Sequence, residues 1–359
     1  MIDQNRIDGL RKYMAQTGLE QVLMGNPINI NYFADFGAFK SDRATFLYVT
    51  QTQAKVLTSD IIGYTTLGGM DVAYHTDGDN VCEEIAKYTI HDKPLGVDGD
   101  YPAKWLLPLR DFNAASDYVL ADRAIHLQRA HKDEAERQLL REASQMNDRV
   151  MAKVRGIFHD GITEREAAGI ISQMFVEEGA DMPGWCIVAF GEGSADVHHH
   201  PGDTQLKPGD VILVDMGSPR KGYHSDMTRT FFWKSVTDYQ REIYELVKSA
   251  NLAGEAAVLP GNRCCDVDSA ARGLIAAAGY GPNFTHRLGH YIGLELHDPG
   301  DIIGGNTDPL EPGMAFSCEP GVYLPGQFGV RVEDLVIVKE DGTAEVLNHD
   351  NKELEILGI

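Results

Sequence analysis

Four carboxylate side chains of this sequence lie in apolar, strand-like stretches, where an unpaired charge is costly. They are Asp215, Asp226, Glu319 and Glu333, and His290 stands beside a pair of glycines. Hard divalent cations take oxygen ligands, and an imidazole also admits Mn, Fe, Co or Zn. Two divalent ions would neutralise the four carboxylates. The set therefore predicts a two-metal hydrolytic site, in which both ions hold an attacking oxygen.

Residues 209–230 indicate two strands joined by a tight turn, and they carry the first two carboxylates. An apolar run ends at Asp215, and turn-forming residues follow at 219–222. If the turn is centred between Arg220 and Lys221, Asp215 and Asp226 face each other across the strand pair. Opposed like charges repel, which favours a cation between them. On this stretch alone, a surface hairpin with two solvated aspartates remains an alternative.

Three further segments carry candidate residues. His198, His199 and His200 follow one another in a polar turn, but adjacent strand residues point to opposite faces, so at most two can face one site. A solvated loop is the alternative. Residues 285–298 place three histidines among glycines. Residues 329–338 are expected to form one apolar strand with Arg331 and Glu333 on the same face, for which a simple salt bridge is the alternative.

The elements around these residues indicate an α/β (α+β) protein of two domains, residues 1–125 and 126–359. The first is expected to contain a helix over 6–17, strands at 22–24 and 45–50, a turn at Asn26-Pro27 and a polar loop over 36–43. Residues 92–100 and 111–117 are expected to be further strand and turn.

In the second domain, apolar residues at three- and four-residue steps predict a long helix over 135–154. Thr163 and Glu166 form a capping-box pattern before a second helix, which ends at Gly179. Helices over about 239–258 and 261–279 follow, and Gly161 and Gly179 recur as Gly261 and Gly279. The domain is therefore expected to consist of two similar helix–helix–strand halves with a shared site between them.

Composition narrows the function classes. The chain has 359 residues and a net charge of −22, which makes nucleic acid an unsuitable partner. No window approaches the roughly 20 apolar residues of a membrane helix, and no secretory signal is recognised near the first residues. The five cysteines are scattered and odd in number, which favours reduced thiols and a cytoplasmic location.

Four motifs resemble those of the pita-bread metallopeptidases, which include methionine aminopeptidase, Xaa-Pro aminopeptidase and Xaa-Pro dipeptidase (prolidase). They are VDMG with GYHSDMTRT, HRLGHYIGLELHD, SCEPGVYLPG and GVRVEDLVIV. The similarity is dense over 130–348. Before that it is looser and resembles a creatinase/prolidase N-terminal domain. The resemblance implies such a domain followed by a pseudo-twofold pita-bread catalytic domain, and it is strongest to bacterial Xaa-Pro dipeptidases.

The resemblance also implies a role for each matching residue. Asp215 would bind one metal, His290 and Glu319 the second, and Asp226 and Glu333 would bridge both. Two divalent ions are implied, with Mn²⁺ expected and Co²⁺, Zn²⁺ or Fe²⁺ left open. Glu319 would also be the general base. His198 and His297 would contact the substrate carbonyl, move protons or stabilise the oxyanion, and Arg331 would bind the substrate carboxylate.

The function expected from this resemblance is metal-dependent hydrolysis of Xaa-Pro dipeptides by a homodimer. An Xaa-Pro aminopeptidase that takes longer peptides is the nearest alternative. A non-catalytic binding protein and a metal-free creatinase-type hydrolase are disfavoured, because all five ligands are present. Tyr291, Asp298 and Val197 depart from the family pattern, and Tyr291 is expected to narrow the pocket. The 36–43 loop is expected to reach the active site of the same or a partner subunit.

Overall fold

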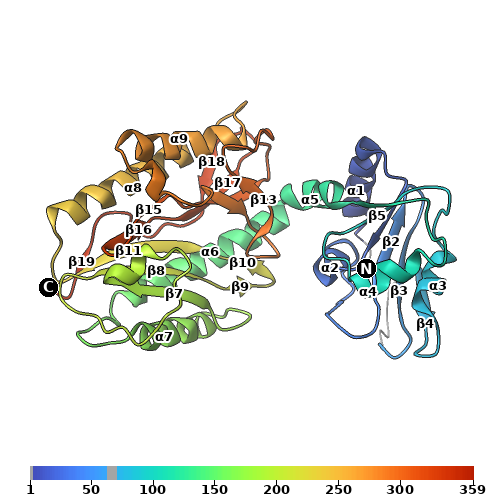
Figure 1. Cartoon of the computed structure of the whole chain (residues 1–359), viewed down its shortest axis with the longest axis horizontal. Coiled ribbons are helices and arrows are strands. Elements are labelled where there is room, and N and C mark those ends of the chain that lie inside the picture. The colour runs from blue at the N-terminus through green and yellow to red at the C-terminus, as the bar shows by residue number, and fades with distance from the viewer. Residues whose placement is uncertain (1–2, 63–70) are drawn as a thin grey trace. The chain divides into compact units, whose positions relative to one another are not determined.

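The computed structural model describes residues 3–62 and 71–359, so Met1 and Ile2, the first residues of the stretch expected to lack a secretory signal, lie outside it. The chain divides into two compact units, Met1–Arg129 and Ala130–Ile359 (Figure 1). Within the described residues, no helix is both long and apolar enough to cross a membrane. Each unit has its own sheets and core, and they are described in turn.

The first unit is built on a six-stranded mixed sheet in the order β4-β3-β2-β1-β5-β6. Its strands are β1 Gln21–Met24, β2 Phe46–Thr50, β3 Ala54–Ser59, β4 Asp71–His75, β5 Leu95–Val97 and β6 Tyr118–Leu120. Its helices are α1 Gln4–Thr17, α2 Pro27–Ala34, α3 Val81–Ala86, α4 Ala103–Leu109 and α5 Asp122–Ala130.

The expected first helix is confirmed, and it ends at Gly18 in the left-handed conformation. The turn expected at Asn26-Pro27 is wrong, because these residues begin α2. The Asn26 side chain accepts a hydrogen bond from the backbone amide of Ile28. Pro27 occupies the first helical turn, where an N–H would have no partner within the helix, so its absence costs nothing. Residues 111–117 contain no strand, which begins only at β6.

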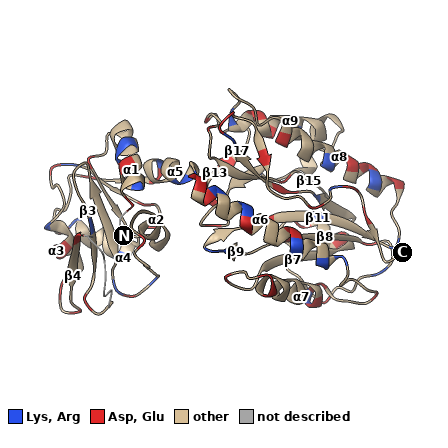
Figure 2. Cartoon of the chain, turned by 180° about the vertical axis from the view of Figure 1, so that it is seen from behind, with Lys and Arg blue, Asp and Glu red and all other residues tan. Residues whose placement is uncertain are grey.

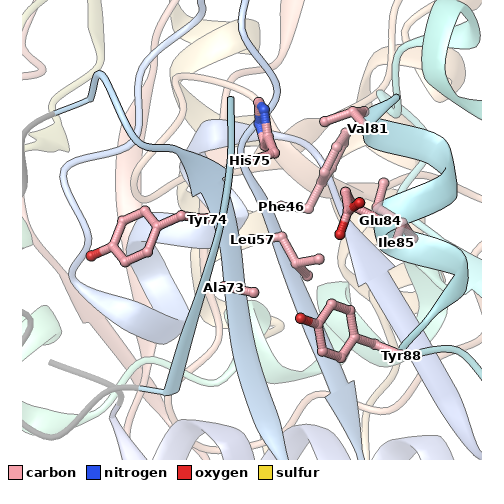
Figure 3. A pocket seen from close by; sticks show the side chains of 9 residues that line it. All are labelled: Phe46, Leu57, Ala73, Tyr74, His75, Val81, Glu84, Ile85 and Tyr88. Carbon is pink, nitrogen blue, oxygen red and sulfur yellow. The ribbon is translucent and has the colours of Figure 1, made fainter. Parts of the chain in front are cut away.

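A small hollow lies between the sheet and α3 of this unit (Figure 3). Its volume is about 10 Å³, enough for about one water molecule. His75 lines it, and its Nε2 lies 3.0 Å from the carbonyl oxygen of Ala44. This histidine is therefore satisfied by the backbone, and the hollow is too small for a ligand.

The second unit holds a four-stranded sheet, β19-β11-β8-β7, a five-stranded sheet, β13-β12-β14-β17-β18, and the hairpins β9-β10 and β15-β16. The strands are β7 Trp185–Phe190, β8 Val211–Gly217, β9 Pro219–Arg220, β10 Tyr223–His224, β11 Met227–Trp233, β12 Gly289–Tyr291, β13 Asp298–Ile302, β14 Ala315–Cys318, β15 Gly321–Leu324, β16 Phe328–Arg331, β17 Asp334–Val338, β18 Ala344–Val346 and β19 Ile356–Leu357. The helices are α6 Glu134–Val154, α7 Glu164–Glu177, α8 Asp238–Ala256 and α9 Cys264–Ala277, with the 3₁₀ turns η1 Gly191–Ala195 and η2 Gly281–Asn283.

The expected duplication of this unit is confirmed. Helices α6 and α7 precede β7, β8 and β11, and helices α8 and α9 precede β12, β14 and β17. The four glycines that bracket α7 and α9 all have positive φ, between 81° and 92°. In Figure 1, α8 and α9 lie on one side of the strands and α7 on the other. Each half has its own buried cluster, represented by Ile171 with Val214 and by Ile275 with Phe316.

Local signals fix the helices that frame the strands. Thr163 and Glu166 form the expected capping box, each side chain accepting the other's backbone amide. Helix α6 carries charges of both signs (Figure 2), and its Arg141 donates to Glu345 of β18 at 2.6 Å. The first helix of the first half is thereby bonded to a strand of the second half.

Candidate active site

The hairpin that carries the first two carboxylates turns one residue later than expected. Its centre lies between Lys221 and Gly222, which have φ of 50° and 82°. A two-residue hairpin turn of this type needs positive φ at both central positions, which a glycine adopts without strain. Asp215 is consequently paired with Thr228 across the strands. The expectation that it directly faces Asp226 is wrong.

The remaining candidate ligands sit at strand ends of the second half. His290 lies in β12, and Glu319 directly follows β14. The single strand expected over 329–338 is wrong, since the chain breaks between β16 and β17. Strand β16 pairs with β15, whereas β17 pairs with β14, so the chain changes sheet at Val332 and Glu333. That break places Glu333 where the two sheets meet.

Asp226, His290 and Glu333 offer ligand atoms that all lie within 4.8 Å of one another. The Nε2 atom of His290 is 3.4 Å from Asp226 Oδ2 and 3.6 Å from Glu319 Oε1. Its Nδ1 lies 3.0 Å from the carbonyl oxygen of Tyr291, an arrangement that leaves Nε2 to the carboxylates. The cluster joins side chains from both halves of the unit.

Several carboxylate oxygens in and beside this cluster have no hydrogen-bond partner among the described residues. Asp215 Oδ1, Asp226 Oδ1 and Glu333 Oε1 are buried and accept no hydrogen bond from any described residue. Buried polar atoms are normally satisfied, so three orphaned carboxylate oxygens in one place need an explanation. A cation supplies one, and a donor set of carboxylates with one imidazole suits a divalent metal. The residues present therefore fit a metal centre.

Burial raises the pKa of these carboxyl groups. The pKa of Asp226 and that of Glu333 are raised strongly, mainly by burial and then by neighbouring carboxylates. Burial likewise raises the pKa of Glu319 to about 7, although the positive charges of His290 and Arg331 oppose it. Without metal, the protein therefore disfavours the charged forms of these carboxyl groups.

The metal-free protein is therefore expected to lose stability as pH rises from about 4, where unfolded carboxyl groups titrate, to about 7, the pKa of Glu319. Because the folded-state pKa values are raised, the folded chain binds protons more tightly than the unfolded chain, so deprotonation favours unfolding. Urea unfolding in EDTA at pH 5 and pH 8 measures this, and Mn²⁺ should restore stability at pH 8.

The Glu319→Gln variant is the control for this prediction. Glu255, whose side chain bonds Lys352 outside the cluster, also has a pKa raised to about 7 and contributes in the same direction. The difference between the pH slopes of the wild type and Glu319→Gln isolates the contribution of Glu319. Equal slopes would contradict the effect of Glu319.

One cavity of about 540 Å³ holds all eight residues expected at the site. Its lining includes Asp215, Asp226, His290, Glu319, Glu333, His198, His297 and Arg331. The structure thus brings these residues together, while their individual roles stay predictions. His297 lies close to the cluster, with its ring centroid 4.1 Å from that of His290. Burial, followed by the charges of His290 and Arg287, lowers the pKa of His297 to about 4.

The three consecutive histidines have different surroundings. His198 is exposed and lines the cavity, whereas His200 is exposed and does not line it. His199 Nε2 lies 2.8 Å from Oε2 of Glu164, which is fully buried at the start of α7. Glu164 also accepts the amide of Gly202 at 2.9 Å. Both contacts fix the loop that presents His198.

Arg331 is buried at the end of β16, with a side chain 2% exposed. Its Nε donates to Thr228 at 3.0 Å, its Nη1 to the Tyr323 hydroxyl at 2.8 Å and its Nη2 to Asp215 Oδ2 at 2.6 Å. Each guanidinium nitrogen therefore already bonds a protein group. The assignment of Arg331 to a substrate carboxylate stays a prediction, and the bonds of this side chain do not support it.

Two departures from the family pattern lie away from the cavity lining. The expectation that Tyr291 narrows the pocket is wrong, because its ring is in the core, 5% exposed, with its hydroxyl 3.5 Å from Cys264 Sγ. A buried tyrosine usually finds a hydrogen-bond partner for its hydroxyl, as Tyr291 does here. Asp298 is buried with Lys132, their atoms 3.1 Å apart. Val197 does line the cavity.

Sequence reasoning missed part of the cavity. Its apolar wall includes Trp185, Ile187, Leu296 and Ile303, which are scattered along the chain and were not recognised as site residues. His286 also lines it, with Nε2 2.8 Å from the Tyr323 hydroxyl. Burial lowers the pKa of His286 to about 3, which keeps this ring neutral. In the sequence, the grouping of three histidines within residues 285–298 was the signal that could have identified His286 as a site residue.

A duplicated α/β unit that brings a histidine and carboxylates with orphaned oxygens into one cavity is typical of a metal-dependent hydrolase. Comparison with known families agrees. Residues 138–340 match metallopeptidase family M24, and residues 6–131 match the creatinase/prolidase N-terminal domain. The chain belongs to metallopeptidase family M24, with a creatinase-type N-terminal domain and a pita-bread catalytic domain. The family implies divalent metal ions at the carboxylate cluster.

Individual relatives match between 70% and 99% of the chain. The Xaa-Pro dipeptidase of Lactobacillus delbrueckii subsp. lactis is 32% identical over 98% of this chain and 99% of its own length. The probable dipeptidase PepE of Mycobacterium tuberculosis (strain ATCC 25618 / H37Rv) is 41% identical over 70% of this chain and 67% of its own. The crystal structure of recombinant prolidase from Thermococcus sibiricus superposes with a TM-score of 0.91 at 29% identity, covering 99% of this chain and 100% of that one.

Proposed function

We propose that this chain is an Xaa-Pro dipeptidase that hydrolyses dipeptides and releases free proline. The observation that carries the proposal is a cavity of about 540 Å³ that is lined by four carboxylates, four histidines and two arginines. The cavity has room for a dipeptide, and its lining offers carboxylates to the substrate amine and arginines to the substrate carboxylate. The similarity to an Xaa-Pro dipeptidase and to a prolidase over almost the whole chain supports the same substrate class.

Asp215, Asp226, His290, Glu319 and Glu333 would hold two divalent ions, which we propose to be Mn²⁺. Ions bound there would supply an activated water and polarise the scissile carbonyl. Glu319 faces the cavity and is placed to take a proton from the attacking water. His198 and His297 line the same cavity, where they can donate hydrogen bonds to the carbonyl oxygen as charge develops on it.

The prolyl bond gives a chemical reason for a specialised site. A prolyl amide has no N–H, and its ring fixes φ, so a site that recognises the backbone amide fails on it. The apolar wall of Trp185, Ile187, Leu296 and Ile303 suits an aliphatic ring. We further propose a homodimer in the cytoplasm, and the five free cysteines are in keeping with that compartment.

Alanyl-proline is expected to release proline in the presence of Mn²⁺, and EDTA is expected to abolish the release. An alanyl-prolyl-alanine tripeptide should be cleaved much more slowly, because the substrate carboxylate would lie about 3.3–3.6 Å further from the scissile bond. Proline and alanine are quantified by chromatography over time for both peptides.

The outcomes separate the candidate functions. Preferred cleavage of the tripeptide would move the protein to the Xaa-Pro aminopeptidases. Cleavage that persists in EDTA would contradict the metal assignment. Cleavage of neither peptide by protein with bound Mn²⁺ would contradict the substrate class, and a non-catalytic binding protein would become the better description.

A further inference from the structure

The carboxylate of a dipeptide needs a positive partner inside the cavity. The cavity already contains four carboxylates, and the whole chain carries a net charge of −22, so a further anion enters against an unfavourable field. Among the described residues that line the cavity, Arg287 and Arg331 carry a permanent positive charge. One of these two guanidinium groups is the natural candidate.

Arg331 does not have a free nitrogen. Its Nε, Nη1 and Nη2 each donate to a protein oxygen, and its side chain is 2% exposed. Rotating it toward a substrate would break its 2.6 Å bond to Asp215. That bond holds a proposed metal ligand, so binding the substrate would disturb the metal site.

Arg287 is in a different situation. Its side chain is 31% exposed, and its Nη1 bonds Asp301, whose own side chain is 46% exposed. No other hydrogen bond of the Arg287 side chain is present within the described residues. A partly exposed ion pair is weak and screened, so the guanidinium keeps donors for a second carboxylate.

The backbone places Arg287 beside the metal cluster. Arg287 lies next to His286, and its partner Asp301 is the cross-strand neighbour of His290 in the β12–β13 pair. The ion pair thus links the guanidinium to β13, the strand that pairs with the His290 strand β12. Asp301 would hold the guanidinium group of Arg287 in position at the cavity.

We propose that Arg287 binds the free carboxylate of the substrate and so selects dipeptides over longer peptides. This inference rests on the proposed Xaa-Pro dipeptidase function. The carboxylate of a dipeptide belongs to the residue that leaves, one fixed distance from the scissile bond. A longer peptide has an uncharged amide at that point, which cannot form the charge-assisted fork.

The test compares alanyl-proline with alanyl-prolinamide, which lacks the negative charge but keeps the scissile bond. Arg287→Met keeps the apolar length of the side chain and removes the fork. It is expected to lower kcat/KM for alanyl-proline by about 10- to 100-fold, the size of a hydrogen bond to a charged group, mostly through KM. The kcat/KM for alanyl-prolinamide should change less than about threefold, and Arg287→Lys should restore part of the loss.

Two internal controls keep this result interpretable. Arg263→Met removes another exposed arginine that pairs with an aspartate, Asp266, away from the cavity lining, and it should leave both substrates unaffected. The amide substrate reports whether Arg287→Met is folded and metal-loaded. A variant that fails on both substrates because it misfolds is replaced by Arg287→Lys, which must then weaken the acid more than the amide.

The two proposals fail in different ways. Wild-type protein that cleaves neither alanyl-proline nor its amide would overturn the Xaa-Pro function and the role of Arg287 with it. Active wild type together with equal losses on both substrates in the Arg287 variants would overturn the carboxylate role alone. Unchanged kinetics on both substrates would do the same.

Discussion

Replacing Asp226 with alanine is expected to abolish peptide hydrolysis and to remove most of the thermal stabilisation that Mn²⁺ gives. Asp226 is 3% exposed and lies in the cluster whose ligand atoms are within 4.8 Å of one another. Its Oδ1 has no partner among the described residues, so this oxygen is available to a metal. Asp226 is proposed to bridge both ions. Without its oxygens, Asp215 would lose the cation that the two aspartates are expected to share.

A variant that lacks the Asp226 carboxylate is expected to fold well without metal. Burial and the charge of Asp215 raise the pKa of Asp226 strongly, so its carboxylate opposes folding of the metal-free chain at neutral pH. Asp226→Asn, which keeps the shape and removes the charge, should be at least as stable as the wild type in EDTA at pH 8. Loss of activity combined with unimpaired metal-free stability separates a missing ligand from a misfolded protein.

Melting curves with and without Mn²⁺ and metal content after dialysis measure both effects. Asp203→Ala is a suitable control, because Asp203 pairs with Arg165 on the surface with its side chain 84% exposed. It should keep wild-type activity and the wild-type response to Mn²⁺. Hydrolysis at the wild-type rate by Asp226→Ala would refute the two-metal assignment.

The composition of the candidate site could be predicted from the sequence. Acidic residues inside apolar strands are conspicuous, because burying them without a partner is costly. That signal identified Asp215, Asp226, Glu319 and Glu333, and the structure brings all four to one cavity. The helices were predictable for a related reason, since a capping box such as Thr163 with Glu166 is a local pattern.

The geometry between these residues was less accessible. The register of the 209–230 hairpin depends on backbone angles at Lys221 and Gly222, and a shift of one residue in the turn changes every pair. The break between β16 and β17 depends on which strands they pair with, and those partners are distant in sequence. Local patterns contain neither kind of information.

The partners of long side chains were also hidden. The family resemblance assigned Arg331 to the substrate carboxylate, and its position beside Glu333 in an apolar stretch left a simple salt bridge as the alternative. Its three bonds join it to Thr228, Tyr323 and Asp215, and only the folded chain brings these groups together. Tyr291 was judged by its position beside His290, although neighbouring strand residues point to opposite faces. Its ring accordingly enters the core.

Replacing His198 with alanine is expected to lower kcat by about 10²- to 10⁴-fold, the usual range for a group that moves a proton or stabilises an oxyanion. His198 is exposed and lines the cavity, so its removal creates no void in the core. The loop itself should persist, because Glu164 holds it through His199 and Gly202. Metal content and the melting temperature should therefore stay at wild-type values.

His200→Ala is the matched control for this prediction. His200 lies in the same loop and is also exposed, but it does not line the cavity, so its removal should leave kcat and KM unchanged. If both variants keep the wild-type rate, His198 has no catalytic role and is simply a residue of a solvated loop. If both lose activity equally, the loop rather than the imidazole matters, and the buried carboxylate of Glu164 becomes the residue that explains the loss. A loss confined to His198 assigns the effect to one imidazole that faces the cavity.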